Sequence, residues 1–293
     1  MDISKYEIFL AVVDQGSYSR VSSELGYTPS ALSKMMKSLE TEAGMQLIFR
    51  SNKGISLTPE GERVIPLIRK MVRCHEELEE EYALIHGLEK GKVRIGCFPT
   101  IAFVWIPKIV AAFQDRCPNI QVEVTEENSV GQLEYWLSHN VIDVGVFSRD
   151  ASQPFDWLME KEDPYVVMMQ KDHRLAEKPV LTKEDLSGAE LLLFKYLGAV
   201  DQDVSSLKEV LARHPEQMFS SNSDMAVISM IERTDAVALQ PQIIAERECE
   251  LFDVTYRPVA FEIGRTIGVA VRDRKQLSPS VARFVRFCEE TGF

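Results

Sequence analysis

Four polar side chains near the N-terminus have the types and spacing that reading DNA requires. Ser30, Ser33, Lys34 and Lys37 fall on one face of a predicted helix, away from its apolar residues. Hydroxyl and ammonium groups on the exposed face of a helix can reach base edges and phosphates in the major groove of DNA. The pattern therefore predicts that this helix enters the groove.

Two short apolar runs after this helix flank a polar turn. Residues 47–50 and 55–57 are predicted to pair as two strands, with Ser51-Asn52-Lys53-Gly54 between them. Arg50 and Lys53 of this two-stranded wing then lie where a cation can contact the phosphate backbone. The predicted DNA contacts are Ser30, Ser33, Lys34, Lys37, Arg50 and Lys53.

Three amphipathic helices must position these side chains. Gly16 closes the first helix, and the second ends at Gly26, which supplies a left-handed stop. Thr28 caps the third helix, with Pro29 at the first helical position. A short helix, a tight turn and a longer capped helix form a helix-turn-helix. The alternative is a three-helix packing module with solvated lysines. The predicted buried stripe of the third helix is Leu32, Met35, Met36 and Leu39.

The charge of the chain does not by itself favour DNA binding. The formal net charge is −12, with 33 Lys and Arg against 45 Asp and Glu. Residues 1–60 carry six basic and seven acidic side chains, whereas residues 91–293 carry 22 and 31. A near-neutral segment can meet phosphates only if its basic side chains gather on one face.

Residues 2–61 resemble the N-terminal domain of LysR-type transcriptional regulators almost without gaps. The resemblance rests on the stretch FLAVVDQGSYSRVSSELGYTPSALSKMMKSLETEAGMQLIFRSNKGISLTPEG. It implies a sequence-specific DNA-binding regulator of transcription. The side chains that it places against DNA are Ser30, Ser33 and Lys34 in the groove, and Arg50 and Lys53 on phosphate.

One position departs from the family pattern. The family usually has Gln where this chain has Pro29, and Gln can pair with adenine. Because proline cannot make that contact, we expect this chain to read a different base there or to rely more on DNA shape.

A long helix is predicted from Thr58-Pro59-Glu60 to about Leu88. Its apolar positions alternate between spacings of four and three residues, and such a heptad seam needs a partner helix. The simplest partner is the same helix of a second subunit. The resemblance likewise implies a dimer through this linker and a tetramer overall. Pro66 predicts a kink, and His75 is a polar residue in the seam. The predicted dimerisation residues are Val64, Ile68, Met71, Leu78, Tyr82 and Ile85.

Strand-like and helix-like segments alternate after Gly91. This alternation predicts an open, mostly parallel sheet with helices on both faces. The strand-like segments are 92–97, 120–126, 143–148, 165–170, 190–194, 236–239 and 267–272, and the helix-like segments are 103–115, 130–139, 202–213, 223–233 and 279–290.

The ends of these strands carry the candidate ligand-binding residues, because ligands of such sheets bind at the carboxyl ends of strands and at helix N-termini. Hydroxyl and N–H groups there suit a carboxylate, and nearby aromatic side chains suit an apolar or aromatic body. Each residue taken alone can also be an ordinary helix cap. The candidates are Pro99, Thr100, Ile101, Ser129, Phe147, Ser148, Tyr196, Gly198 and Ser223.

The same region resembles the effector-binding domain of LysR-type regulators, a periplasmic-binding-protein-like pair of α/β lobes. The stretch EDPYVVMMQKDHRLA resembles the entry into the second lobe, and GRTIGVAVRDRKQLSPSVARFVRF resembles the return to the first. Thr234-Asp235-Ala236 departs from the Gly-rich turn that is frequent in the family. The resemblance implies that a small-molecule effector binds between the lobes.

The predicted fold class is multidomain. An all-α winged helix-turn-helix domain with a long linker helix precedes an α/β two-lobed periplasmic-binding-protein-like domain. The expected bounds are 1–58 for the DNA-binding domain, 59–90 for the linker helix and 91–293 for the effector domain. Within the last, lobe I takes about 91–162 and 266–293, and lobe II about 163–265.

The sequence contains no pattern typical of catalysis or metal binding. It has no G-x-S-x-G, Gly-rich phosphate loop or H-E-x-x-H motif, and its five His lack metal-ligand spacing. We therefore expect a regulator rather than an enzyme, with no cofactor and no metal. The alternatives are a solute-binding protein with a fused N-terminal domain and an architectural DNA binder without an effector.

The cysteines and the first ten residues indicate where in the cell the protein is expected to be. The five cysteines include no CxxC pair, which fits reduced thiols. The start MDISKYEIFL lacks the basic and apolar segments of a secretory signal, and no run of about 18 apolar residues indicates a membrane span. We expect a cytoplasmic protein with no membrane partner.

Overall fold

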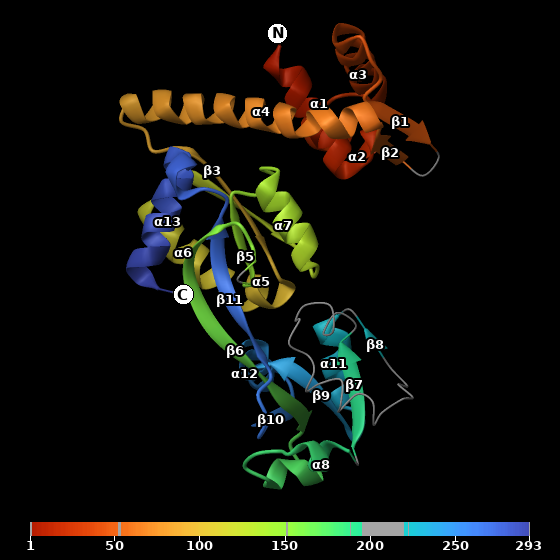
Figure 1. Ribbon diagram of the computed structural model, residues 1–293, viewed down its shortest axis with the longest axis vertical. Coiled ribbons are helices and arrows are strands. Elements are labelled where there is room, and N and C mark those ends of the chain that lie inside the picture. The colour runs from red at the N-terminus through yellow and green to blue at the C-terminus, as the bar shows by residue number, and fades with distance from the viewer. Residues whose placement is uncertain are drawn as a thin grey trace. The chain divides into compact units, whose positions relative to one another are not determined.

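A computed structural model of the chain contains two compact units (Figure 1). One unit comprises residues 1–91 with 139–141, and the other comprises residues 92–138 with 142–293. The residues that the structure describes are 2–51, 54–150, 152–187, 189–194, 220–221 and 223–292.

The first unit begins with three helices. They are α1 (Ile3–Gln15), α2 (Tyr18–Leu25) and α3 (Pro29–Ala43). The side chains of Asp2, Ser17 and Thr28 each accept a backbone N–H from the first turn that follows. Each helix ends at a glycine with positive φ. The stops predicted at Gly16 and Gly26 and the cap predicted at Thr28 are therefore confirmed.

One apolar core holds α3 against α1 and α2. Leu32, Met36 and Leu39 of α3 are at most 1% exposed, whereas Met35 is only partly buried. Burying an apolar side chain of this size stabilises the fold by about 1.5–3 kcal/mol relative to leaving it exposed. The buried residues of this core are Ile8, Phe9, Val12, Val21, Leu32, Met36, Leu39, Leu47, Ile48, Ile65 and Ile68.

The predicted wing is present as two antiparallel strands. They are β1 (Ile48–Ser51) and β2 (Gly54–Leu57), paired from Ile48↔Leu57 to Ser51↔Gly54. The Ile55 N–H donates to the Gly16 carbonyl at 2.9 Å, so the wing is anchored at the end of α1. Gly54 has a φ of 121°, and a Cβ there would lie 2.8 Å from the Gly16 oxygen, so glycine is required at this position.

The long predicted helix is α4 (Pro59–Ile85). Thr58 caps it by accepting the Gly61 N–H at 3.0 Å. The helix continues through Pro66 without a break, so the kink expected there does not interrupt it. Ile65 and Ile68, near its N-terminus, belong to the core of the three short helices.

A single sheet runs through the second unit. Among the described residues its strands follow the order β4-β3-β5-β11-β6-β9-β7-β8, and β10 pairs with β6 beside this path. The strands are β3 (Gly91–Cys97), β4 (Ile120–Glu126), β5 (Val144–Ser148), β6 (Asp156–Gln170), β7 (Glu190–Phe194), β8 (Ser220–Ser221), β9 (Ala236–Pro241), β10 (Val254–Pro258) and β11 (Gly264–Val271).

The sheet is mixed, so the prediction of a mostly parallel sheet was wrong. β3 and β5 pair in parallel, as do β7 and its two neighbours. β11 runs antiparallel to β5 and β6, and β6 runs antiparallel to β9 and β10. The first half of β6, DWLMEKEDP, has few apolar residues, so hydrophobic patterning detected only its second half.

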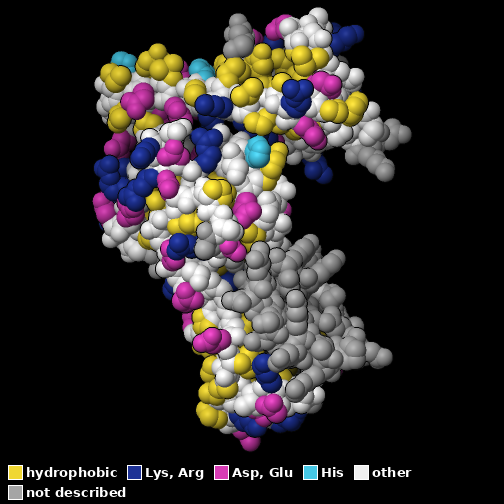
Figure 2. All heavy atoms as spheres, in the orientation of Figure 1, with side chains coloured by type: hydrophobic (Ala, Val, Ile, Leu, Met, Phe, Trp, Pro, Cys, Tyr) yellow, Lys and Arg dark blue, Asp and Glu magenta, His cyan; other side chains and the backbone are white. Residues whose placement is uncertain are grey.

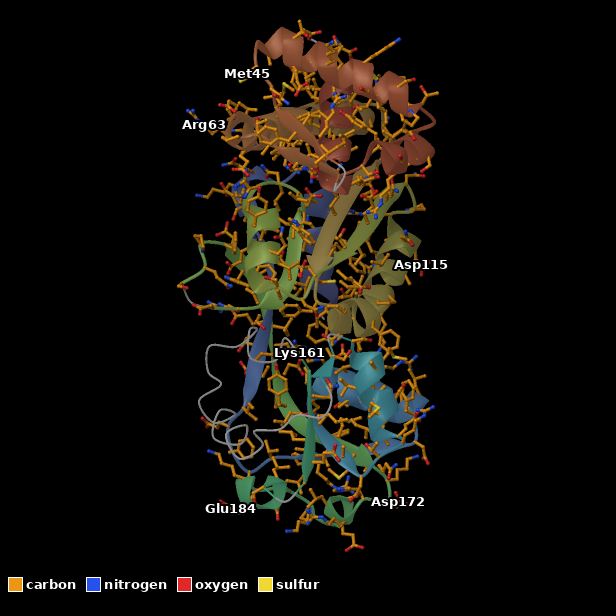
Figure 3. The ribbon with its side chains drawn as sticks, turned by 90° about the vertical axis from the view of Figure 1, so that its right-hand side faces the viewer. Met45, Arg63, Asp115, Lys161, Asp172 and Glu184 are labelled. Atoms are coloured by element: carbon orange, nitrogen blue, oxygen red, sulfur yellow. The ribbon has the colours of Figure 1, made fainter. Side chains whose placement is uncertain are left out.

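The strands β6 and β11 carry the chain between two lobes (Figures 1 and 3). Residues 156–164 of β6 pair with β11 in lobe I, which also holds β3, β4 and β5. Residues 165–170 of β6 pair with β9 and β10 in lobe II. Lobe I has one buried core that contains Phe113, Phe147 and Phe284. Lobe II has two, with Val166 in one and Val167 and Leu239 in the other.

Helices cover the sheet of each lobe. They are α5 (Pro99–Val104), α6 (Ile106–Arg116), α7 (Val130–Ser138) and α13 (Pro279–Thr291) in lobe I, and α8 (Lys183–Leu186), α11 (Asp224–Ile231) and α12 (Gln242–Leu251) in lobe II. The helix predicted at 103–115 is two helices that meet at Trp105, because Pro107 lacks an N–H for the preceding turn. Patterning missed α12, and the helix predicted at 202–213 lies outside the described residues.

Candidate nucleic-acid interface and ligand cleft

The exposed face of α3 carries hydroxyl and ammonium groups. Ser30, Lys34 and Lys37 are exposed, and neither lysine has an ion-pair partner among the residues that the structure describes. By contrast, Lys5 and Arg69 are neutralised within the same unit by Glu42 and Asp14. The two lysines of α3 therefore remain available to phosphate or to base edges.

Arg50 joins the wing to the helices. Its Nη1 donates to Ser33 Oγ at 2.7 Å, and its guanidinium carbon lies 5.1 Å from the centre of the Tyr18 ring. Burial raises the pKa of the Tyr18 hydroxyl, while the positive charge of Arg50 acts in the opposite direction. Arginine has five N–H donors, so these contacts fix the guanidinium and leave donors for a phosphate. Ser33, which was predicted to face the groove, accepts this hydrogen bond from Arg50.

One row of exposed side chains on the second half of α4 is apolar, although the same half also carries a run of glutamates. Leu78, Tyr82 and Ile85 are 47%, 50% and 76% exposed. Figure 2 shows hydrophobic side chains gathered along this helix. Such a row at heptad spacing is typical of a helix that packs on another helix.

A buried ion pair lies where the two lobes meet. The Arg265 Nε donates to Asp163 Oδ2 at 2.9 Å, and the two residues face each other across β11 and β6. Arg265 Nη2 also donates to Thr100 Oγ1, at the start of α5, at 3.2 Å. Asp163 Oδ1 accepts the Ile243 N–H, in the first turn of α12, at 3.0 Å. The pair therefore connects the crossing strands to one helix of each lobe.

Several buried polar atoms of the same unit lack hydrogen-bond partners in the described part of the chain. They include Ser148 Oγ at the end of β5, Gln240 Nε2 near the end of β9, and both carboxyl oxygens of Glu248 on α12. These side chains are at most 6% exposed. Because buried polar groups are nearly always hydrogen-bonded, such a set marks a place where a ligand or water supplies the missing partners.

Two carboxyl groups of lobe II have raised pKa values. Burial raises the pKa of Glu248 to about 8, and the nearby Asp224 adds to the effect. Burial also raises the pKa of Asp224, at the start of α11, to about 6, while Arg265 opposes this change. The lobe II side of the junction is thus acidic and holds protons near neutral pH.

The matches to known families cover most of the chain. Residues 3–62 match the bacterial regulatory helix-turn-helix proteins of the lysR family, and residues 86–292 match the LysR substrate binding domain. The chain belongs to the LysR family. It is therefore a DNA-binding transcriptional regulator with a substrate-binding effector domain.

Individual proteins resemble this LysR regulator over its full length. It is 29% identical over 295 residues to the probable HTH-type transcriptional regulator LrrA of Synechococcus elongatus, with 100% of this chain and 98% of the relative covered. Its fold is similar to that of the LysR family transcriptional regulator CbnR, with a TM-score of 0.67, 17% identity and complete coverage of both chains. Full-length CbnR complexed with its target DNA gives a TM-score of 0.65, 17% identity and 99% coverage of both chains. The two CbnR structures show that the fold is shared.

The candidate effector residues of this LysR regulator fall into three groups. Thr100 and Ser148 are buried near the lobe junction, and Pro99 begins α5 beside them. Ile101 and Phe147 are fully buried in the core of lobe I, so they support the cleft rather than line it, contrary to expectation. The remaining candidates are Ser129, which caps α7, Ser223 at the start of α11, and Tyr196 and Gly198, which lie outside the described residues with Lys53.

Sequence reasoning missed the charged and amide groups of the junction. Arg265 and Gln240 each interrupt an otherwise apolar strand, in GRTIGVAV and AVALQP, and that interruption was the available signal. Glu248 lies on a helix that was not predicted. The ion pair of Arg265 with Asp163 depends on strand register, which the sequence does not display.

Two further properties concern only the described part of the chain. Every helix there is too short or too polar to span a lipid bilayer. No three His, Cys, Asp or Glu side chains there are grouped so that they could hold a metal ion.

Proposed function

We propose that this LysR regulator reads its operator with the exposed face of α3. Ser30, Lys34 and Lys37 reach bases or phosphates in the major groove, and Arg50 and Lys53 of the wing contact phosphate. The exposure of the two lysines and the fixed position of Arg50 support this assignment. Ser33 acts by orienting Arg50, to which it is hydrogen-bonded.

The effector binds between the lobes, against Thr100 and Ser148, with Arg265 bridging the two sides. The hydrogen bond from Arg265 to Thr100 carries this proposal, because it links a crossing strand to the first turn of a lobe I helix. An effector that competes for Thr100 changes how the lobes are held together. For regulation the effector must prefer one lobe arrangement, typically by ~1–3 kcal/mol.

The functional unit is at least a dimer formed through α4. Leu78, Tyr82 and Ile85 supply the exposed seam, with Met71 nearer the N-terminus. Ile68 and Val64 pack on the core of the three short helices, so their contribution to the dimer is indirect. The dimer brings two recognition helices to one operator.

The chain acts as a cytoplasmic regulator without catalytic activity of its own. Membership of a transcriptional regulator family supports this reading. The chemistry of the junction agrees with it, because the buried groups there are arranged around an ion pair rather than around a nucleophile and base.

DNA binding by the full-length chain, with and without an effector, tests the proposal. A metabolite library is screened for compounds that raise the Tm, and each hit is titrated while DNA affinity is measured by fluorescence anisotropy. We expect a hit to change operator affinity by roughly 5–150-fold. The double variant Thr100→Val/Ser148→Ala should lose this response.

A matched control separates the cleft from general effects of the substitutions. Thr125→Val removes an exposed hydroxyl from β4 and should leave the response intact. If the double variant responds to the hit as the wild type does, the cleft is not the effector site.

A further inference from the structure

Glu248 is a buried carboxyl group without a hydrogen-bond partner in the described part of the chain. Its side chain is 1% exposed, and neither of its oxygens is hydrogen-bonded. The helix that carries it, α12, faces lobe I, since the Arg247 guanidinium lies 6.0 Å from the Phe103 ring centre of α5. An unpaired buried carboxyl costs free energy, so this group calls for a partner that the described residues do not supply.

Gln240 lies on the same side of the lobe II sheet. Ala238 of β9 packs with Ala245 of α12 in one buried cluster. Side chains two residues apart on a strand share a face, so Gln240 also faces α12. Its Nε2 donor has no partner among the described residues. Among the described residues, a free donor and a free carboxyl therefore lie on the same side of the lobe II sheet.

The charges around Glu248 favour a cation in this space. Asp224 at the start of α11 is close enough to raise the pKa of Glu248, and Cys249 lies beside it on α12. The positive group that acts on Asp224, Arg265 of β11, is already paired with Asp163 of β6. Among the described residues, an anion would meet these two carboxyl groups and a guanidinium that Asp163 already neutralises, whereas a cation would be attracted by the carboxyl groups once they are ionised.

We propose that Glu248, with Asp224 beside it, binds a positively charged nitrogen of the effector. The effector is then a small amine or guanidine, and Gln240 donates to an oxygen acceptor where the effector carries one. This inference rests on the proposed effector cleft, and it names the chemical class of ligand that the cleft takes.

Binding of such a cation releases a proton. Because the pKa of Glu248 is raised to about 8, the unliganded carboxyl is mostly protonated at pH 7. When an ammonium group binds beside it, the carboxyl gives its proton to solvent, and its two oxygens accept hydrogen bonds from the ammonium. One cation enters and one proton leaves, so the net charge of the site is unchanged.

Thermal denaturation of the full-length chain with matched probes tests the class of ligand. The probes are agmatine, putrescine, arginine and lysine as amines, glutarate and benzoate as carboxylates, and 1,4-butanediol as a neutral compound, each compared with sodium chloride at equal ionic strength. We expect an amine to raise the Tm above the salt control. Glu248→Gln and Asp224→Asn should weaken its binding by roughly tenfold or more.

The control variant lies on the same helix. Glu246 is exposed and bonded to Gln242, so Glu246→Gln should bind the amine as the wild type does. If no amine stabilises the wild type, or if an amine binds Glu248→Gln equally well, the inference is wrong. Stabilisation by a carboxylate or the diol alone, lost in Thr100→Val, would overturn the amine class and leave the proposed cleft standing.

Calorimetry in two buffers measures how many protons are released when the amine binds. Titrations of the stabilising amine in phosphate and in Tris at pH 7 give the number of protons exchanged, because the two buffers differ in ionisation enthalpy. We expect proton release in the wild type and in Glu246→Gln, and none in Glu248→Gln. Proton uptake, or equal release in all three proteins, would contradict the role of Glu248.

Discussion

Arg265 and Asp163 are both nearly inaccessible to water, so each compensates for the hydration that the other has lost. Arg265 is 8% exposed and Asp163 is 3% exposed. Removing one member of such a pair leaves the other charged and buried, which is more costly than removing both. Their contribution to the free energy of unfolding is therefore best measured by substituting both residues together.

Arg265→Met should reduce the free energy of unfolding by ~3–5 kcal/mol, because Asp163 is left without its counter-ion. Asp163→Asn/Arg265→Met, which removes both charges, should recover part of that loss. Urea unfolding followed by circular dichroism gives both values. If the double variant loses as much free energy of unfolding as Arg265→Met and Asp163→Asn lose together, the two charges are not coupled.

Lys34→Ala should weaken binding to the operator by roughly 1–3 kcal/mol if the lysine reads a base. Non-specific DNA should then be affected less than the operator, and fluorescence anisotropy on both DNAs measures the difference. Lys108→Ala, at an exposed position of α6, is the control. Equal weakening on both DNAs would reduce Lys34 to a phosphate contact, and no weakening would remove it from the interface.

These side chains differ in how well the sequence predicts them. Caps such as Thr28 and stops such as Gly26 act within a few residues, so their roles can be deduced from neighbours alone. Arg265 and Asp163 are brought together by the register of two strands that are far apart in sequence. Burial adds a second limit, because an apolar candidate such as Phe147 can end in the core instead of the cleft.

The wing is held at one end by a backbone contact that only glycine allows. Gly54→Ala would force a Cβ to within 2.8 Å of the Gly16 oxygen at a φ of 121°. We expect the first unit to lose about 1–3 kcal/mol of stability. Gly131→Ala, in α7 with no close neighbour, should instead gain roughly 0.5–1 kcal/mol. Thermal denaturation of both variants checks the contrast, and equal effects would contradict it.

The exposed seam of α4 should decide the oligomeric state. Leu78→Glu places a charge in the middle of the apolar row and should dissociate the dimer, since a buried charge in a helix pair is costly. Sedimentation velocity reports the mass. Val180→Glu, at an exposed apolar position of lobe II, should leave the mass unchanged. An unchanged mass for Leu78→Glu would place the dimer contact elsewhere.

The elements with one apolar face were predicted best, for a physical reason. Helical periodicity and caps identified α1, α3 and α13, which have one apolar face and a polar first turn. The first half of β6 pairs with β11 yet is rich in charge, so it lacks the alternation of a half-buried strand. Its role as the link between lobes follows from topology, which only the structure displays.

The stability of the second unit should fall as the pH rises toward 8. The pKa of Glu248 is about 8 in the folded chain against an ordinary 4.5, so the folded chain keeps a proton that the unfolded chain has released. Folding then takes up a proton between these values, and the free energy of unfolding declines across that window. Asp224, with a pKa of about 6 against 3.8, adds to the decline at its acidic end.

Glu248→Gln should flatten this decline, because an amide needs no proton to be neutral. Urea unfolding at pH 5, 6, 7 and 8 measures the slope, and the variant should exceed the wild type most clearly at pH 8. Glu246→Gln serves as the control, since that side chain is exposed. Identical slopes in the wild type and Glu248→Gln would show that another group takes up the proton.

The crossing between the lobes consists of the paired strands β6 and β11, which lie in direct contact there. Pro164 and Gly264 face each other there, and a Cβ on the glycine would lie only 3.0 Å from the proline Cα. The chain thus leaves lobe I and returns to it at adjacent positions, which makes lobe II an insertion with touching ends. A two-residue turn such as Asn-Gly joins neighbouring antiparallel strands. Deleting the codons for 165–263 and inserting such a turn would therefore leave lobe I with an unbroken hairpin. Recombination could then exchange lobe II for another domain without changing the fold of lobe I.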